Sequence, residues 1–209
     1  MPVNKRNYQK ELDRTIAEIQ RRGETPKLLL HVCCAPCSSY CLEYLSEFFE
    51  ITVFYFNPNI SIKEEYEHRL NEEKRYISLK EFKNPVKITE SRYDPQEFFA
   101  AVKGLEREPE GGLRCKECFR LRLEESAKKA KELGFDYFTT TLTISPLKNA
   151  ELLNDIGVQM GDKYGVSWLY SDFKKKEGYK RSIELSREYD LYRQNYCGCV
   201  FSKELRDES

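Results

Sequence analysis

The sequence lacks any long hydrophobic run. No apolar stretch in its 209 residues reaches the roughly 18 residues that a helix needs to cross a bilayer. Residues 1–23, MPVNKRNYQKELDRTIAEIQRRG, are charged throughout and contain no apolar segment of the kind that a secretion signal requires. These absences predict a protein with no membrane span that resides in the cytoplasm.

The sequence also lacks an excess of charge of either sign. The chain carries 35 basic and 35 acidic residues. Sequence-independent binding to duplex nucleic acid favours a net positive surface. The balance therefore argues against broad binding of this kind, and it leaves open a small local contact with RNA.

Short apolar runs alternate with helical patterns along the chain. The runs predict five strands, at 27–32, 51–56, 86–93, 135–142 and 166–171. The helical patterns predict a lead helix within 1–26, a helix that starts at Ser38 or Ser39, and helices at about 62–82, 95–104, 115–133 and 150–160. Such alternation is typical of a parallel sheet with helices on both faces. We therefore expect one α/β domain over residues 1–209, with a partly helical C-terminal extension at 172–209.

Ligands of such sheets bind beyond the carboxyl ends of the strands. The residues expected at this edge are Cys33 and Cys34, Asn57, Asp94, 140–145 and Ser171. Two adjacent thiols therefore lie at the predicted ligand site. His31, inside the first strand, is expected to be an ordinary core residue.

Eight cysteines dominate the chemistry of the chain, and in a reducing compartment they are not expected to form disulfides. Seven of them fall into three groups, Cys33/Cys34/Cys37, Cys115/Cys118 and Cys197/Cys199, whereas Cys41 is expected in the core. Cys115 and Cys118 open a helix, where the helix dipole stabilises the thiolates that bind metal. The adjacent pair and the Cys-x-x-Cys motif together supply four soft ligands, which suit zinc or an iron–sulfur cluster.

Three segments resemble a known family: HVCCAPCSSY, CKECFRLRLEESAKKAKELGFDYFTTTLTISPLKN and YRQNYCGC. They resemble the cobalamin-independent epoxyqueuosine reductases (QueH family), over about residues 27–200. This resemblance implies an adenine-nucleotide α-hydrolase-like (PP-loop) fold, and reductive removal of the epoxide oxygen of epoxyqueuosine to give queuosine at the tRNA wobble position. CCAPCSS replaces the glycine-rich loop of ATP-dependent relatives, so ATP use is not expected.

The resemblance also implies roles for individual residues. Cys33, Cys34, Cys115 and Cys118 become ligands of a 4Fe–4S cluster that receives electrons from an external donor. We assign a second metal ion, expected to be iron, to Cys197 and Cys199. Asp94 is the candidate proton donor because of its position after a strand, although an N-cap before Pro95 explains it equally well.

Contacts with the tRNA anticodon stem-loop are expected from residues near the site and from the C-terminal extension. The candidates are Cys37, Asn57, Lys174, Lys175, Lys176 and Tyr196. Basic residues interleaved with aromatic ones suit phosphates and unstacked bases. A solvated helix with its tyrosines on the core is the alternative interpretation of this stretch.

Three other functions stay open at this point. The chain could be a zinc-bearing tRNA-modifying enzyme of the same fold, a thiol–disulfide oxidoreductase that uses Cys115 and Cys118, or a metal-stapled RNA-binding module. Iron–sulfur content separates the first of these from the reductase, because zinc is colourless and an iron–sulfur protein is brown.

Overall fold

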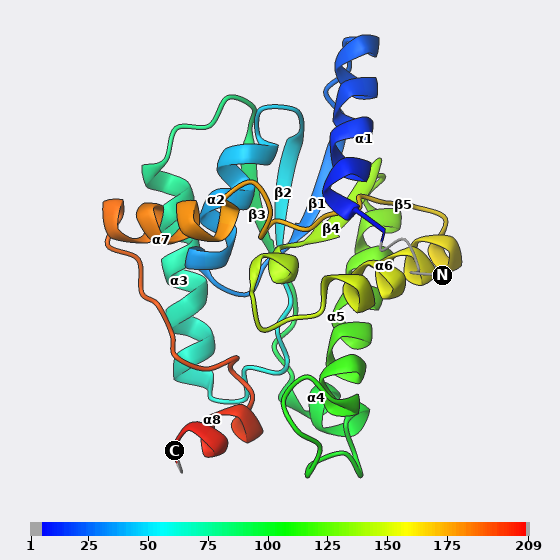
Figure 1. Ribbon diagram of the computed structural model, residues 1–209. Coiled ribbons are helices and arrows are strands. Elements are labelled where there is room, and N and C mark those ends of the chain that lie inside the picture. Colours follow the sequence, from blue (N-terminus) through cyan, green and yellow to red (C-terminus); the bar gives the residue numbers. More distant parts are fainter. Residues whose placement is uncertain (1–5, 208–209) are drawn as a thin grey trace, which may run out of the picture.

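The computed structural model describes residues 6–207, and the side chains of the last helix are described as far as residue 203. Five parallel strands form one sheet in the order β3-β2-β1-β4-β5 (Figure 1). Their bounds are β1 Lys27–His31, β2 Glu50–Tyr55, β3 Val86–Glu90, β4 Tyr137–Thr140 and β5 Ser167–Trp168. The predicted α/β class with an all-parallel sheet is confirmed.

Helices cover both faces of this sheet, as the alternation predicted. One core contains residues of α1 (Tyr8–Arg22), α2 (Ala35–Leu45) and α3 (Lys63–Leu79), with α7 (Gly178–Glu188) packed outside α2. The other face is covered by α5 (Leu113–Glu132) and α6 (Ala150–Tyr164). Strand β1 serves both cores, because Leu28 and Leu30 face the first and Leu29 faces the second.

Two boundaries differ from the sequence-based expectation for physical reasons. Helix α2 begins at Ala35 rather than at Ser38 or Ser39, because Pro36 in its first turn already has a helical φ and Cys34 serves as the extended N-cap. Strand β4 stops at Thr140, where the chain turns into the 3₁₀-helix Thr141–Ile144. The Thr140 side chain accepts a hydrogen bond from the Leu142 amide and fixes this turn.

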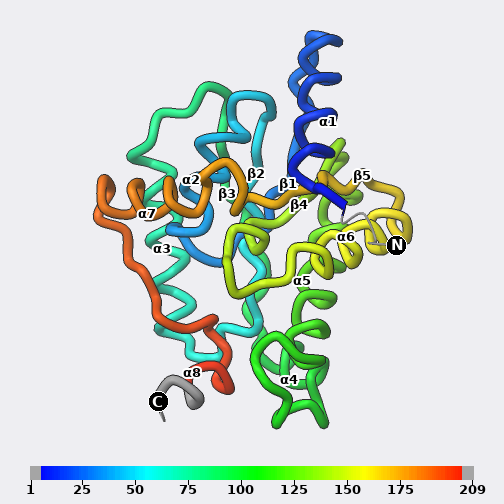
Figure 2. Tube along the Cα trace, in the orientation of Figure 1, coloured from blue at the N-terminus to red at the C-terminus, as the bar shows by residue number. Residues whose placement is uncertain are grey.

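The C-terminal extension folds back over the site edge of the sheet. After α7 the chain runs along α3 and ends in α8 (Val200–Asp207), which lies near α4 (Pro95–Ala101) in Figure 2. Arg75 on α3 donates to the carbonyl oxygens of Tyr189 and Asp190, and Phe201 packs with Phe98. These contacts carry the third cysteine group from a distant part of the sequence to the sheet. Among the helices within 6–207, none is long and apolar enough to cross a membrane.

Candidate metal centre

The candidate site lies where the strand order reverses. Strands β1 and β4 are neighbours, and the chain leaves β1 toward α2 on one face and leaves β4 toward α6 on the other. Such a switch point opens a crevice beyond the strand ends. A cavity of about 150 Å³ is found here, lined by residues that follow both strands, including Cys33 and Lys148.

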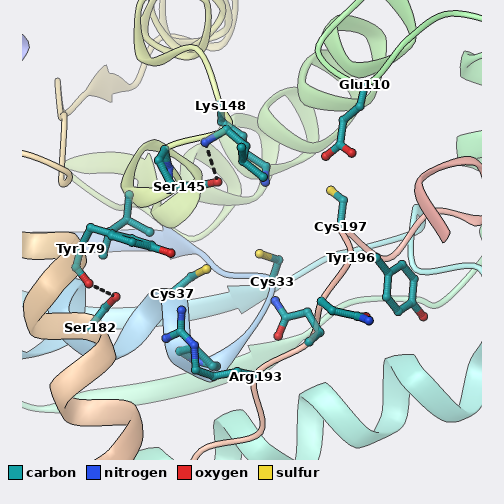
Figure 3. A pocket seen from close by; sticks show the side chains of 16 residues that line it. Cys33, Cys37, Glu110, Ser145, Lys148, Tyr179, Ser182, Arg193, Tyr196 and Cys197 are labelled. Atoms are coloured by element: carbon teal, nitrogen blue, oxygen red, sulfur yellow. Dashed lines mark hydrogen bonds between the residues drawn. The ribbon is translucent and has the colours of Figure 1, made fainter. Parts of the chain in front are cut away.

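Three thiols share this cavity. Figure 3 shows Cys33, Cys37 and Cys197 around the same space, with Lys148 and Tyr196 also on its wall. Cys33 comes from the β1–α2 connection and Cys37 from the first turn of α2, whereas Cys197 belongs to the C-terminal segment. The first and third cysteine groups of the sequence therefore meet at this cavity.

The first group is tight enough to bind a single ion. The sulfur atoms of Cys33, Cys34 and Cys37 all lie within 4.8 Å of one another, and those of Cys33 and Cys34 are 3.8 Å apart. Four sulfurs that bind one tetrahedral ion at about 2.3 Å lie at similar separations. Among the side chains that the structure describes, this is the one group of three or more potential ligands that is so compact.

Local hydrogen bonds favour the thiolate form of Cys33 over those of Cys34 and Cys37. Hydrogen bonds from Cys34 and Cys37 lower the pKa of Cys33 well below its usual value, and the charge of Arg122 lowers it further. The pKa of Cys34 is raised because it acts as a donor to Cys33. Burial lowers the pKa of Lys148, but the nearby thiols of Cys197 and Cys33 outweigh burial and raise it. Lys148 thus stays cationic beside the thiols.

A second cavity of about 90 Å³ adjoins the first. Its wall includes four thiols, from Cys115, Cys118, Cys197 and Cys199. Cys115 and Cys118 lie in the first turns of α5, and the Gly111 amide donates to the Cys115 sulfur at 3.2 Å. Cys197 lines both cavities, so all three cysteine groups converge on one region. All eight cysteines are free thiols in this structure.

A buried arginine holds the third group in place. Arg69 on α3 is 1% exposed and pairs with Glu65 at 2.6 Å. It also donates to the carbonyl oxygens of Tyr196, at 3.4 Å, and of Cys197, at 3.3 Å. Gly198 has a φ of +112°, and a Cβ there would lie 2.8 Å from Ile60. Glycine is required at this position because a side chain would be both strained and crowded.

Beneath the thiols lies a buried polar network. Arg122 on α5 donates to Asn57 at 2.7 Å and contacts the ring of His31 at 3.3 Å. Asn57 also donates to the carbonyl oxygen of Val32, so its observed contacts are structural, and it is not among the residues that line either cavity. Burial and the charge of Arg122 lower the pKa of His31 to about 3, so His31 is a neutral core histidine, as expected.

The remaining predicted site residues lie farther out. Asp94 is exposed and caps α4 by accepting a hydrogen bond from the Gln96 amide at 2.9 Å, and it lines neither cavity. Lys174 pairs with Asp172 and Lys176 pairs with Asp13. Lys174 and Lys175 line a neighbouring hollow of about 520 Å³ that also contains Lys148. The capping contact is therefore shown, while catalytic and tRNA-binding roles stay predictions.

Sequence reasoning missed two cations of the site, Lys148 and Arg122. Lys148 follows β4 in the turn SPLKN, at the strand edge where ligands were expected. Arg122 lies four residues after Cys118 on α5, a spacing that places both on one face of the helix. Both signals were available in the sequence.

Comparison with known proteins identifies the family. The family model described as "Epoxyqueuosine reductase QueH" matches residues 28–205. The chain belongs to the QueH family. A QueH protein of Streptococcus pyogenes serotype M1 is 46% identical over 207 residues, which cover 98% of this chain and 81% of the relative. One of Staphylococcus epidermidis is 48% identical over 208 residues, covering 97% of this chain and 87% of the relative, and one of Thermotoga maritima is 37% identical, covering 84% and 89%. Each of these relatives is named epoxyqueuosine reductase QueH.

The ligand atoms of this QueH-family site fit a group that binds through sulfur. The compact triad contains thiols alone, and no histidine or carboxylate completes it among the side chains described. Soft thiolate donors favour zinc, copper(I) and iron–sulfur clusters over magnesium or calcium. The donor chemistry therefore agrees with a resident iron–sulfur or thiolate-bound metal cofactor.

Proposed function

We propose that this chain reduces epoxyqueuosine in tRNA to queuosine. Loss of the epoxide oxygen as water leaves an alkene and consumes two electrons and two protons. An external donor supplies the electrons. The observation that carries the proposal is the convergence of three distant cysteine groups on adjoining cavities at the switch point of the sheet, in a chain of the QueH family.

In this proposal Cys33, Cys34, Cys115 and Cys118 hold a 4Fe–4S cluster. Ligands of a cluster bind different iron atoms, so they can lie farther apart than ligands of one ion. Cys33 and Cys118 both lie close enough to Arg122 for its charge to act on them, which supports a shared centre. Cys197 and Cys199 hold the second ion, expected to be iron. When bound, the cluster supplies electrons singly and the second ion acts as a Lewis acid.

The protein's own groups bind and orient the substrate. Cys37 and Tyr196 line the first cavity, where an aromatic ring offers a surface on which an unstacked base can rest. The cationic Lys148 borders the same cavity and stabilises negative charge that develops on a substrate oxygen. Lys174, Lys175 and Lys176 supply phosphate contacts, with Asn57 behind the site as a positioning group. Asp94 stays a candidate proton donor.

The experiment is reduction of tRNA that carries epoxyqueuosine by the anaerobically purified protein, with dithionite as the electron source. Digestion and mass spectrometry measure the queuosine formed. We expect turnover by the native chain and a loss of at least about 100-fold in Cys118→Ser. Cys41→Ala is the matched control, because Cys41 is fully buried in the core and is not among the residues that line either cavity. Absence of queuosine with the iron-loaded native chain contradicts the proposal.

The zinc-containing alternative has one observation in its favour, since the Cys33/Cys34/Cys37 triad suits a single tetrahedral ion. Metal analysis of the anaerobically purified protein separates the two. Zinc without iron supports the alternative, and iron with acid-labile sulfide supports the reductase.

A further inference from the structure

Arg122 is a fully buried guanidinium among neutral partners. It is 1% exposed, and its guanidinium donates to the Asn57 amide oxygen at 2.7 Å and contacts the His31 ring at 3.3 Å, with the thiol of Cys118 also near it. Both partners are uncharged, because His31 is neutral at physiological pH. Among the side chains that the structure describes, no carboxylate lies within 4.0 Å of Arg122.

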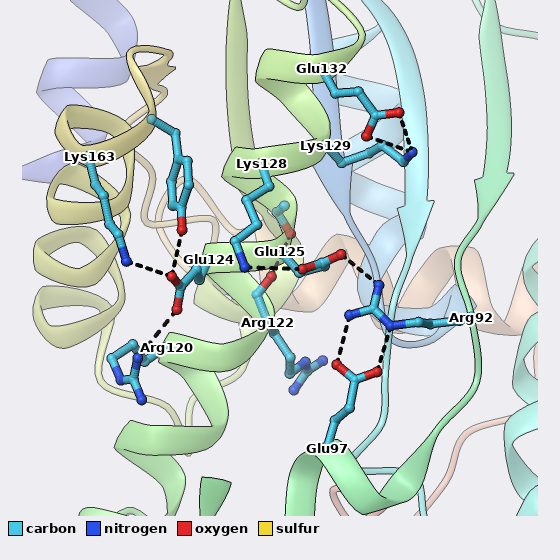
Figure 4. Close-up of polar contacts among 12 residues, drawn as sticks. Arg92, Glu97, Arg120, Arg122, Glu124, Glu125, Lys128, Lys129, Glu132 and Lys163 are labelled. Atoms are coloured by element: carbon cyan, nitrogen blue, oxygen red, sulfur yellow. Dashed lines mark hydrogen bonds and ion pairs between the residues drawn. The ribbon is translucent and has the colours of Figure 1, made fainter.

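The carboxylates nearest in sequence are engaged elsewhere. Figure 4 shows Glu124 bound to Lys163 and Glu125 bound to Arg92, while the guanidinium of Arg122 points away from both. Arg69 is a direct comparison within the same molecule. It is also 1% exposed, but it has Glu65 at 2.6 Å.

A buried charge without a counter-charge costs several kcal/mol. The groups near Arg122 that can become negative are the thiols of Cys118, Cys33 and Cys197, whose charged forms favour the charged guanidinium. Cys118 precedes Arg122 by one helical turn on α5, and Cys33 follows strand β1. The site therefore contains the negative charge that Arg122 requires, provided that these sulfurs are thiolates.

The guanidinium is also held rigidly. His31 is fixed by Thr140 at 2.9 Å and by the carbonyl oxygen of Phe56 at 3.1 Å. Asn57, the second partner of Arg122, is fixed by the carbonyl oxygen of Val32 at 2.8 Å. Contacts to β1, to β4 and to the segment after β2 thus position the charge before any ligand binds.

We propose that Arg122 is the fixed counter-charge of the thiolate centre. Its single positive charge acts on the thiolates of both the Cys33 group and the Cys115/Cys118 group. It stabilises the anionic, metal-bound form of these sulfurs, and it raises the reduction potential of a redox group bound there. Arg122 is a positioning residue and takes no part in bond making. This inference rests on the proposed metal centre, and it holds for any metal that the thiolates bind.

The test compares Arg122→Gln, which removes the charge and keeps a donor, with Arg122→Lys, which keeps the charge. Arg120→Gln on the same helix is the matched control, because Arg120 is 45% exposed and paired with Glu117 and Glu124. Zinc alone is titrated into the reduced, metal-free protein in competition with a chelator. We expect about 10–100-fold weaker binding in Arg122→Gln, and binding within about threefold of the native protein in the other two variants.

A second readout uses the iron-loaded protein. The midpoint potential of Arg122→Gln is expected to shift to more negative values, since loss of a positive charge disfavours the added electron. A tenfold change in the equilibrium constant for reduction corresponds to about 59 mV for one electron. Unchanged zinc affinity together with an unchanged potential overturns the inference. A purely structural role of Arg122 gives that result, because it stabilises the metal-free and the metal-bound forms equally.

If Arg122→Gln does not fold, Arg122→Lys decides alone: a zinc affinity within about threefold of native supports the inference, and a loss of tenfold or more overturns it. Zinc binding also separates this inference from the proposed function. A chain that forms no queuosine but shows the expected zinc affinities retains Arg122 as the counter-charge and refutes only the reductase activity.

Discussion

Replacing Arg69 by methionine tests how the third cysteine group reaches the site. The substitution leaves Glu65 without its partner at 2.6 Å and removes the donors to the carbonyl oxygens of Tyr196 and Cys197. Removing one partner of a buried ion pair lowers the free energy of unfolding by about 3–5 kcal/mol. Glu65 is 15% exposed and keeps the Tyr192 hydroxyl at 3.2 Å, so we expect the lower end, about 3 kcal/mol.

Chemical denaturation measures this loss of unfolding free energy, and it corresponds to a fall in melting temperature of about 6–12 °C for a chain of this size. Hydrogen exchange adds a local readout. The amides of 196–199 should lose protection in Arg69→Met, because the segment is no longer held to α3.

Arg75→Met is the matched control on the same helix. Arg75 is also paired with a glutamate, Glu72, and it also donates to two carbonyl oxygens of the C-terminal segment, but it is 40% exposed. Exposed pairs contribute at most about 1 kcal/mol. If Arg69→Met lowers the unfolding free energy no more than Arg75→Met does, the reasoning from burial is refuted.

Three further predictions concern pH, capping and RNA. Burial raises the pKa of Glu73 from 4.5 to about 8. The folded state therefore keeps a proton that the unfolded chain loses, so stability falls as pH rises from about 4.5 to about 8, and denaturation curves of Glu73→Gln should lack this part of the fall. Asp94→Asn should keep the α4 cap, whereas Asp94→Ala should lose about 1 kcal/mol; loss of turnover in the stable Asn variant would establish a catalytic role, and full turnover would exclude one. Neutralising Lys174, Lys175 and Lys176 together should raise KM for tRNA and reduce the slope of log K against log salt by about 0.7 per lost phosphate contact, and no change in either discards the RNA contact.

The fold was largely predictable because its signals are local. Alternating apolar runs and helical periodicity give the elements of a parallel sheet, and the pattern of β1 places Leu28 and Leu29 on opposite faces. The ends of short strands were harder to predict. Strand β5 has two residues in the structure although VSWLYS reads as a longer strand, because only Ser167 and Trp168 find partners on β4.

The convergence of the thiols was predictable in part. Cys33 and Cys34 follow a strand, and ligands of parallel sheets bind beyond the carboxyl ends of the strands, so this rule alone places the two thiols at the site. The position of Cys197 depends on the return of the C-terminal segment along α3 and on Arg69, which pairs with Glu65 one helical turn away. The contact between Arg69 and the Cys197 carbonyl oxygen spans more than a hundred residues of sequence. Local patterns do not encode such contacts, so the sequence predicts sulfur ligands but does not predict how the sulfur atoms are arranged.

Quantitation of iron and acid-labile sulfide in the anaerobically purified chain, with EPR of the dithionite-reduced sample, tests the central claim most directly. The account predicts a brown protein that contains both, with iron in excess of sulfide because of the second ion, and an EPR signal of a reduced 4Fe–4S cluster that Cys118→Ser abolishes and Cys41→Ala preserves. A colourless protein that contains zinc, or no metal, under the same conditions contradicts it.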